Sequence, residues 1–401
     1  MNINKKKSRT TVILFFGAIL AGALTGIVTG IVPGLHINTV AFVLSLVSLF
    51  EGNLVFAVFL MSMSVAHNFF DFIPAIVFGA GEESSALSTF AGNRMFLEGS
   101  GVRALKLTAF GGLVGTSAFL ALTPVLGVVL PVLFTFLADY AWILLAGISA
   151  HLLFLDAKKE ALFVFFASGI LGLFALNSTL SFPLLSLFSG LFGLGIMWEH
   201  QRTQPVLQRE SYGLPLEKKD LLKAGVFGVV SGIILGVVPA IGPTQASVVL
   251  YSKKDENEFL VRLGAINVAD VFISLLTLFF AGSARSGVLV IMQEFFVLSA
   301  QSMLFLFVAG FLSAVVSFFV CLRFGTRIIK HIATLNYGHL VRIVVFAILM
   351  LNFVSNGVLG VVVCVSGALI SRVAIRSKSM KSHAMGCLIV PTLIGYVLRA
   401  M

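Results

Sequence analysis

Two short motifs, far apart in the chain, place a carboxylate three residues after an asparagine in apolar surroundings. Asn68 and Asp71 lie in the stretch HNFFDFI, and Asn267 and Asp270 lie in INVADVF. A buried carboxylate without a partner takes up a proton or binds a cation. We therefore predict that both pairs serve proton or sodium coupling. The alternatives are that the two carboxylates cap helices or pair with Arg285.

Two apolar segments are interrupted in the same way, GALTGIVTGIVPGLHINTVA at 22–41 and GVVSGIILGVVPAIGPTQAS at 228–247. Glycines at every fourth position let another helix backbone approach closely. The prolines that follow, Pro33 and Pro239, stop or kink a helix. The pattern therefore predicts two broken membrane spans, unless both prolines are kinks that serve packing alone.

The residues after each break are suited to holding an anion. If a helix restarts there, its free N–H groups carry a partial positive charge, and two such restarts would form an anion site. Small polar donors stand at the restarts, namely His36, Asn38 and Thr39 in the first and Thr244, Gln245 and Ser247 in the second. Arg285 adds a guanidinium suited to a carboxylate or phosphate, although an anchor at the membrane surface is an equal alternative.

The composition requires a membrane for these elements. The 401 residues are 58% hydrophobic and 11% charged, whereas soluble proteins carry about 25% charged residues. The lengths of the apolar runs predict an all-α polytopic protein with about 10–12 transmembrane helices. The net charge of +10 is attributed to loops that face lipid headgroups, and not to nucleic-acid binding. We expect the protein in the cell membrane. Its N-terminus should face the cytoplasm, because it carries Lys5, Lys6, Lys7 and Arg9.

The motifs recur in the same order in both halves of the chain. The glycines and proline of the first break match those of the second at an offset of 206, and the Asn-x-x-Asp pairs follow in each half. We therefore expect a first transmembrane repeat over 1–198, a polar linker over 199–220 and a second repeat over 221–401. The positive charge of the linker favours parallel repeats, but we expect inverted repeats whose broken helices meet at the membrane centre.

The two interrupted segments resemble the paired glycine–proline motifs in the large membrane subunit of tripartite tricarboxylate transporters. FGAGEESSALSTFAGNRMFLEGSGVRALKLTAFGG and AGSARSG also resemble regions of the shorter archaeal branch of that family. The resemblance implies a secondary transporter of tri- or dicarboxylates, helped by a small membrane subunit and an extracytoplasmic binding protein. It also implies a substrate site made of Pro33, Gly34, Asn38, Thr39, Pro239, Gly242, Pro243 and Thr244.

The first break departs from the family pattern, because His36-Ile37 stands where bacterial relatives have Gly-Pro. The expected function is a cation-coupled symporter of organic anions that works by alternating access with Na⁺ or H⁺. A carrier of polyprenyl phosphate or another lipid-linked phosphate is the alternative. We expect no enzyme, catalytic residue, metal or cofactor, because the sequence contains no nucleophile–base set or metal-ligand spacing.

Overall fold

A computed structural model describes residues 2–32, 37–45, 53–79, 88–137, 140–200, 204–209, 213–214, 216–237, 256–282, 284 and 286–400. Every regular element in these ranges is helical, so the expected all-α class is confirmed. The first half contains α1 (Asn2–Ile31), α2 (Ile37–Ser45), α3 (Leu54–Phe70), α4 (Phe72–Phe78), α5 (Ser88–Leu97), α6 (Gly101–Leu137), α7 (Ala141–Asp156), α8 (Lys159–Leu176), α9 (Pro183–Phe188), the π-helical turn η2 (Ser189–Leu194) and α10 (Gly195–His200). The second half contains α11 (Lys218–Val237), α13 (Glu256–Ala281), α14 (Gly287–Phe295), α15 (Ala300–Val320), the π-helical turn η3 (Cys321–Gly325), α16 (Thr326–Thr334), α17 (Tyr337–Arg376), the 3₁₀ turn η4 (Lys381–Met385) and α18 (Gly386–Ala400).

Seven helices in the described part are long and apolar enough to cross a membrane, and three more apolar helices are shorter. The expected number of 10–12 refers to the whole chain, and it counts a division of the apolar run at Pro124. Helix α6 instead continues through Pro124 and Pro131 as one element, as membrane helices tolerate when neighbours satisfy the freed backbone groups. Helix α17 is different, because its backbone breaks at Gly357, which has φ 63°, so this range contains two helices that meet at a kink.

The glycine ladder of α1 brings this helix into close contact with α3. A Cβ at Gly22 would lie 3.0 Å from Ser62 Cβ, one at Gly26 would lie 2.8 Å from Ala66 Cβ, and one at Gly30 would lie 2.7 Å from Phe70 Cβ. Each glycine therefore makes room for the next turn of α3, and the two helices run in the same direction. This contact positions the Asn-x-x-Asp motif at the end of α3.

The second ladder makes the matching contact between α11 and α13, but its register differs by one helical turn. A Cβ at Gly228 would lie 2.6 Å from Ala265 Cβ, and Ala265 matches Ala66 at the offset of 199 that relates the two Asn-x-x-Asp motifs. By contact, Gly228 therefore corresponds to Gly26, and not to Gly22 as the offset of 206 would require.

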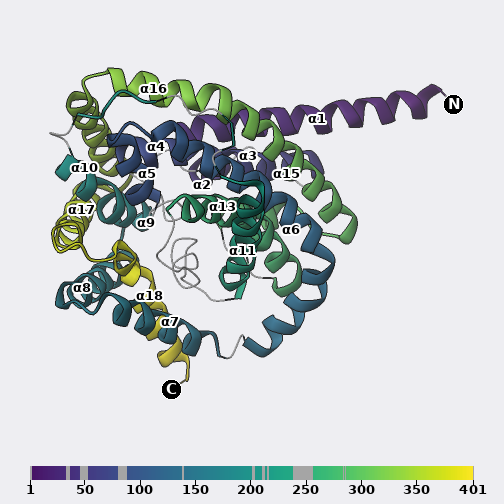
Figure 1. The fold of residues 1–401 in the computed structure, drawn as a ribbon. Helices are drawn as coiled ribbons and strands as arrows, with labels where there is room; N and C mark the ends of the chain where they lie inside the picture. Colours follow the sequence, from purple (N-terminus) through teal and green to yellow (C-terminus); the bar gives the residue numbers. More distant parts are fainter. Residues whose placement is uncertain are drawn as a thin grey trace.

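The helices form two groups, and each half of the chain contributes to both. One group contains α1–α6 with α11 and α13–α16, and the other contains α7–α10 with α17 and α18 (Figure 1). The two groups contact each other at the start of α17, where Tyr337 is buried, stacks on Phe78 and donates a hydrogen bond to the carbonyl of Val77 at 2.7 Å.

Within the second group, helices from one half of the chain pack against helices from the other half. Helix α8 packs against α18, and α17 packs against η2. A Cβ at Gly386 would overlap the carbonyl of Phe165, and a Cβ at Gly190 would overlap the carbonyl of Cys364. Phe165 and Cys364 are 199 residues apart, which is the offset of the Asn-x-x-Asp motifs. The two glycines are 196 residues apart, so a similar close contact occurs twice in this group, with the roles of the halves exchanged and the register shifted by three residues.

A buried ion-pair cluster joins the α7–α8 turn to the turn before α18. Asp156 accepts a hydrogen bond from the N–H of Met380 at 2.7 Å and lies 3.1 Å from Nε2 of His383 and 3.3 Å from Nζ of Lys158. Burial opposes the charge of Asp156, but the Met380 and Lys158 contacts outweigh it and hold the pKa of Asp156 below its ordinary value. Burial also lowers the pKa of His383, against the pull of the Asp156 carboxylate.

This cluster predicts that the protein loses stability in acid. Both groups have a lower pKa in the folded chain, so their contribution is complete above pH about 6.5 and decreases below it, first at His383 and then near pH about 4 at Asp156. His383→Gln should therefore reduce the fall in thermal midpoint between pH about 7.5 and about 5. His331→Gln, at an exposed histidine of α16, is the matched control and should unfold like wild type. An unchanged pH profile in His383→Gln would contradict the assignment.

Candidate functional site

The first broken span is present as two helices. Helix α1 ends at Ile31, directly before Pro33, and α2 begins at Ile37. Asn38, in the first turn of α2, accepts a hydrogen bond on Oδ1 from the N–H of Val288 at 3.0 Å. Val288 lies in the first turn of α14, in the other half of the chain. Asn38, a residue predicted to bind the substrate, therefore links the start of α2 to the N-terminus of α14.

The two Asn-x-x-Asp motifs, 199 residues apart in the sequence, meet in the structure. Asn68 donates from Nδ2 to the carbonyl of Asn267 at 2.6 Å, and Asn267 donates from Nδ2 to the carbonyl of Asn68 at 3.3 Å. Each asparagine side chain thus binds the main chain of its counterpart. The two motifs that we predicted to be equivalent therefore form a reciprocal contact between α3 and α13.

Helices α3 and α13 run in opposite directions at this crossing. Met61 lies before Asn68 and Phe272 lies after Asn267, yet both side chains pack against Gly310 of α15. Moving backwards along α3 therefore corresponds to moving forwards along α13. Each of them runs parallel to its own glycine-ladder helix, α1 or α11.

The two aspartates differ in their surroundings although their motifs match. Asp71 is 2% exposed, and Asn267 Nδ2 lies 3.3 Å from its Oδ1 and 3.2 Å from its Oδ2. Its side chain makes no capping hydrogen bond to α4, so the capping alternative is not supported for it. Asp270 is partly exposed, and Oδ1 accepts from Ser274 Oγ of its own helix at 3.4 Å.

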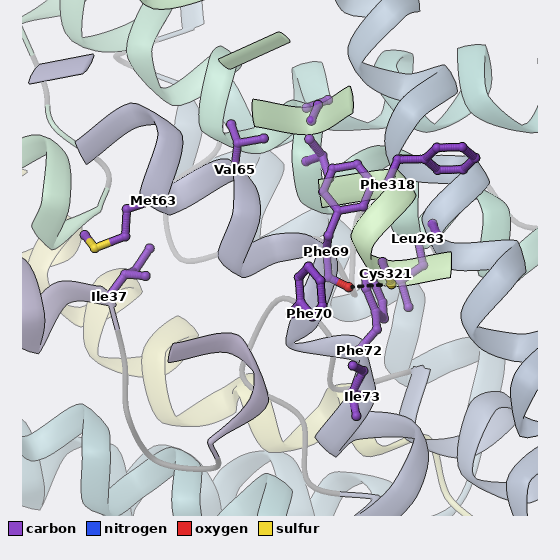
Figure 2. Packing of buried hydrophobic residues seen from close by; sticks show 14 of the residues in the cluster. Ile37, Met63, Val65, Phe69, Phe70, Phe72, Ile73, Leu263, Phe318 and Cys321 are labelled. Atoms are coloured by element: carbon purple, nitrogen blue, oxygen red, sulfur yellow. Dashed lines mark hydrogen bonds between the residues drawn. The ribbon is translucent and has the colours of Figure 1, made fainter. Parts of the chain in front are cut away.

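Polar contacts hold α3 in place around this crossing. His67, which precedes Asn68, is buried and its Nδ1 lies 3.0 Å from Thr29 Oγ1 of α1. Figure 2 shows Cys321 of η3 donating to the carbonyl of Phe69, among the aromatic side chains at the end of α3. The carbonyls of α3 thus serve as acceptors for the second half of the chain, which fixes where Asn68 and Asp71 lie.

Most of the predicted anion-site residues lie outside the described residues. These are Pro33, Gly34, His36, Pro239, Gly242, Pro243, Thr244, Gln245 and Arg285. Thr39 lies on α2, and Asn38 is the predicted ligand whose side chain the structure places. The predicted meeting of two helix restarts therefore stays a prediction.

One contact between the halves was not expected from the sequence. Arg94 of α5 forms an ion pair with Glu256 at the start of α13, and the nearby Glu256 carboxylate raises the pKa of Arg94. The pair joins residues 162 positions apart, and although Arg94 lies in a stretch that carries the family resemblance, nothing there points to Glu256. It could not be found from local spacing.

Comparison with known proteins identifies the family of the chain. The model of the tripartite tricarboxylate transporter TctA family matches residues 16–386. The chain belongs to the TctA family. The matched range includes both glycine ladders and both Asn-x-x-Asp motifs, so the features that form the crossing lie within the TctA region.

The chain is also similar to a protein of an archaeon. An uncharacterized protein of Methanocaldococcus jannaschii, MJ1079, is 25% identical over 398 residues, which cover 95% of this chain and 98% of the relative. No solved structure matches the chain. As a TctA family member with seven apolar helices long enough to span, the chain is a multi-pass membrane component of a transporter.

Proposed function

We propose that the chain is the permease of a tri- or dicarboxylate transporter, which carries its substrate by cation-coupled alternating access. The single observation that supports this most is the reciprocal Asn68–Asn267 contact within a TctA chain. It joins α3 and α13, which run in opposite directions and belong to different halves. Transporters built from inverted repeats bind their substrates at the interface between the repeats.

We infer that the halves are inverted repeats and that the two helix groups move relative to each other. Each half contributes its first helices to one group and its last helices to the other, so rocking one group against the other would open the molecule to alternate sides. Asn38 lies where α2 meets α14, and we place the substrate carboxylates beside this contact, close to the first break. A small membrane subunit and an extracytoplasmic binding protein would deliver the substrate.

Uptake into proteoliposomes tests the proposal. The purified chain should accumulate labelled citrate, or another tri- or dicarboxylate, when a proton or sodium gradient is imposed, and should exchange it without a gradient. Protein-free liposomes provide the control for leakage. Failure to accumulate or exchange any carboxylate, together with flipping of polyprenyl phosphate, would reject the carboxylate permease in favour of a carrier for lipid-linked phosphate.

A further inference from the structure

The crossing of α3 and α13 contains a buried acceptor without a donor. Oδ1 of Asn267 is buried and accepts no hydrogen bond, while Nδ2 of the same amide donates to Asn68 O and to both oxygens of Asp71. An unsatisfied buried polar atom destabilises the folded chain, because it has lost its hydrogen bonds to water without gaining others. The orientation of the Asn267 amide therefore has to be explained, because its N–H groups are hydrogen-bonded and its oxygen is not.

The ionised state of Asp71 explains this arrangement. A carboxylate only accepts hydrogen bonds, so it draws the N–H side of the Asn267 amide and leaves Oδ1 unpaired. The opposite orientation of the amide would bring Oδ1 against the Asp71 carboxylate and the Asn68 carbonyl, which are both acceptors. The observed orientation is the better one for a charged Asp71, at the cost of the unpaired oxygen.

One proton would satisfy every group in the pair. A protonated Asp71 has an O–H donor and a carbonyl acceptor. With a rotation about its Cβ–Cγ bond, it can donate the O–H to Oδ1 of Asn267 and accept from Nδ2 of the same amide, as a cyclic pair of two hydrogen bonds. The proton comes from water on one side of the membrane and leaves to water on the other, and no other bond changes.

We propose that Asp71 and Asn267 form the proton-binding site of the transporter. The inference rests on the proposed function and makes H⁺ its coupling ion. Sodium fits the pair less well, because Asn267 presents an N–H donor to Asp71, and an N–H donor repels a cation. Turning the amide to present Oδ1 to sodium would also remove the hydrogen bond from Nδ2 to Asn68 O.

The matching carboxylate, Asp270, does not have this partner. The amide of Asn68 donates to the carbonyl of Asn267 at 2.6 Å, whereas Asp270 accepts from Ser274 of its own helix. The proton site is therefore asymmetric within a symmetric crossing. Asp270 provides a matched control in an equivalent motif.

Other titratable groups stand within about one helical turn of the pair on the elements packed around it. His67 precedes it on α3 and contacts Thr29 of α1, Cys321 belongs to η3, and Asp270 follows Asn267 on α13. The Sγ of Cys321 lies 3.8 Å from the carbonyl oxygen of Phe69, two residues before Asp71. The experiment must therefore assign the proton to Asp71 by substitution.

Infrared difference spectroscopy of the full chain in liposomes makes this assignment without transport. A change of pH should produce a protonated-carboxyl band that disappears in Asp71→Asn and persists in Asp270→Asn. Adding sodium at constant pH should leave the band unchanged. A band that survives in Asp71→Asn, or one that sodium removes at constant pH, would overturn the proposal.

Transport of citrate as the probe gives the second test. Asp71→Asn supplies permanently the donor that a proton supplies to Oδ1 of Asn267, so it should fold and should lose citrate accumulation driven by a proton gradient. Accumulation at the wild-type level in this variant would reject the proton site. If wild type neither exchanges nor accumulates any carboxylate, the proposed function fails, and the infrared result alone still decides whether Asp71 binds the proton.

Discussion

Replacing Gly26 by valine is expected to lower the free energy of unfolding by about 3 kcal/mol, because α1 and α3 would have to separate. A Cβ at this position would overlap the carbonyl of Met63 and lie 2.8 Å from Ala66 Cβ and 2.9 Å from His67 N. Two of these neighbours are backbone atoms, which cannot rotate away. The loss is measured as the decrease in the thermal midpoint of unfolding in detergent, which is monitored by size-exclusion chromatography.

Gly17→Val is the matched control for this substitution. Gly17 lies in the same helix, and a Cβ there would meet no atom within 4 Å, so the variant should unfold like wild type. Equal losses in both variants would mean that valine disturbs α1 in general, and the proposed role of the ladder in positioning the α3 motif would be wrong.

Asn38→Leu should reduce carboxylate transport by about 100-fold while the protein stays folded, because the start of α2 would no longer be held against α14. The substitution removes the acceptor for the Val288 N–H, and it places an apolar side chain beside the proposed substrate carboxylates. Initial rates of labelled citrate uptake measure the effect, and the elution profile of the purified variant reports folding.

Ser286→Ala separates positioning from simple capping. Ser286 Oγ accepts from the N–H of Leu289 at 3.3 Å at the same helix terminus, but Ser286 does not belong to α2. Loss of one cap costs about 1 kcal/mol of stability, so this variant should transport at a rate near that of wild type. If both variants lose transport equally, Asn38 matters only as a cap of α14, and the substrate site lies elsewhere.

Composition and local spacing were sufficient to predict several features of this protein. A chain with 11% charged residues must bury most of its surface in lipid, which gave the all-α membrane class. The family resemblance, carried by the glycine–proline breaks, is confirmed by the match over residues 16–386. The end of α1 before Pro33 also follows from the chain itself, because proline acts on its own helix.

Other features depended on contacts between distant segments. The two glycine ladders match in sequence at an offset of 206 residues. In the structure, however, α11 packs on α13 in a register shifted by one helical turn, because the side chains of both helices determine how they pack. The chain also passes through Pro124 without a break, since neighbouring groups can satisfy the freed backbone. A proline therefore does not by itself mark the end of a span, whereas Gly357 does interrupt α17.

The sequence by itself determined that two equivalent Asn-x-x-Asp motifs exist in an apolar chain, because motif and composition are properties of neighbouring residues. Only the tertiary structure decided that they bind each other, that Asp71 is buried against the amide of Asn267 and that Asp270 is not. Identical local spacing puts each aspartate three residues after its asparagine, although Asp71 lies between α3 and α4 and Asp270 lies inside α13. What surrounds each of them is set by helices from the other half, whose packing no local pattern encodes.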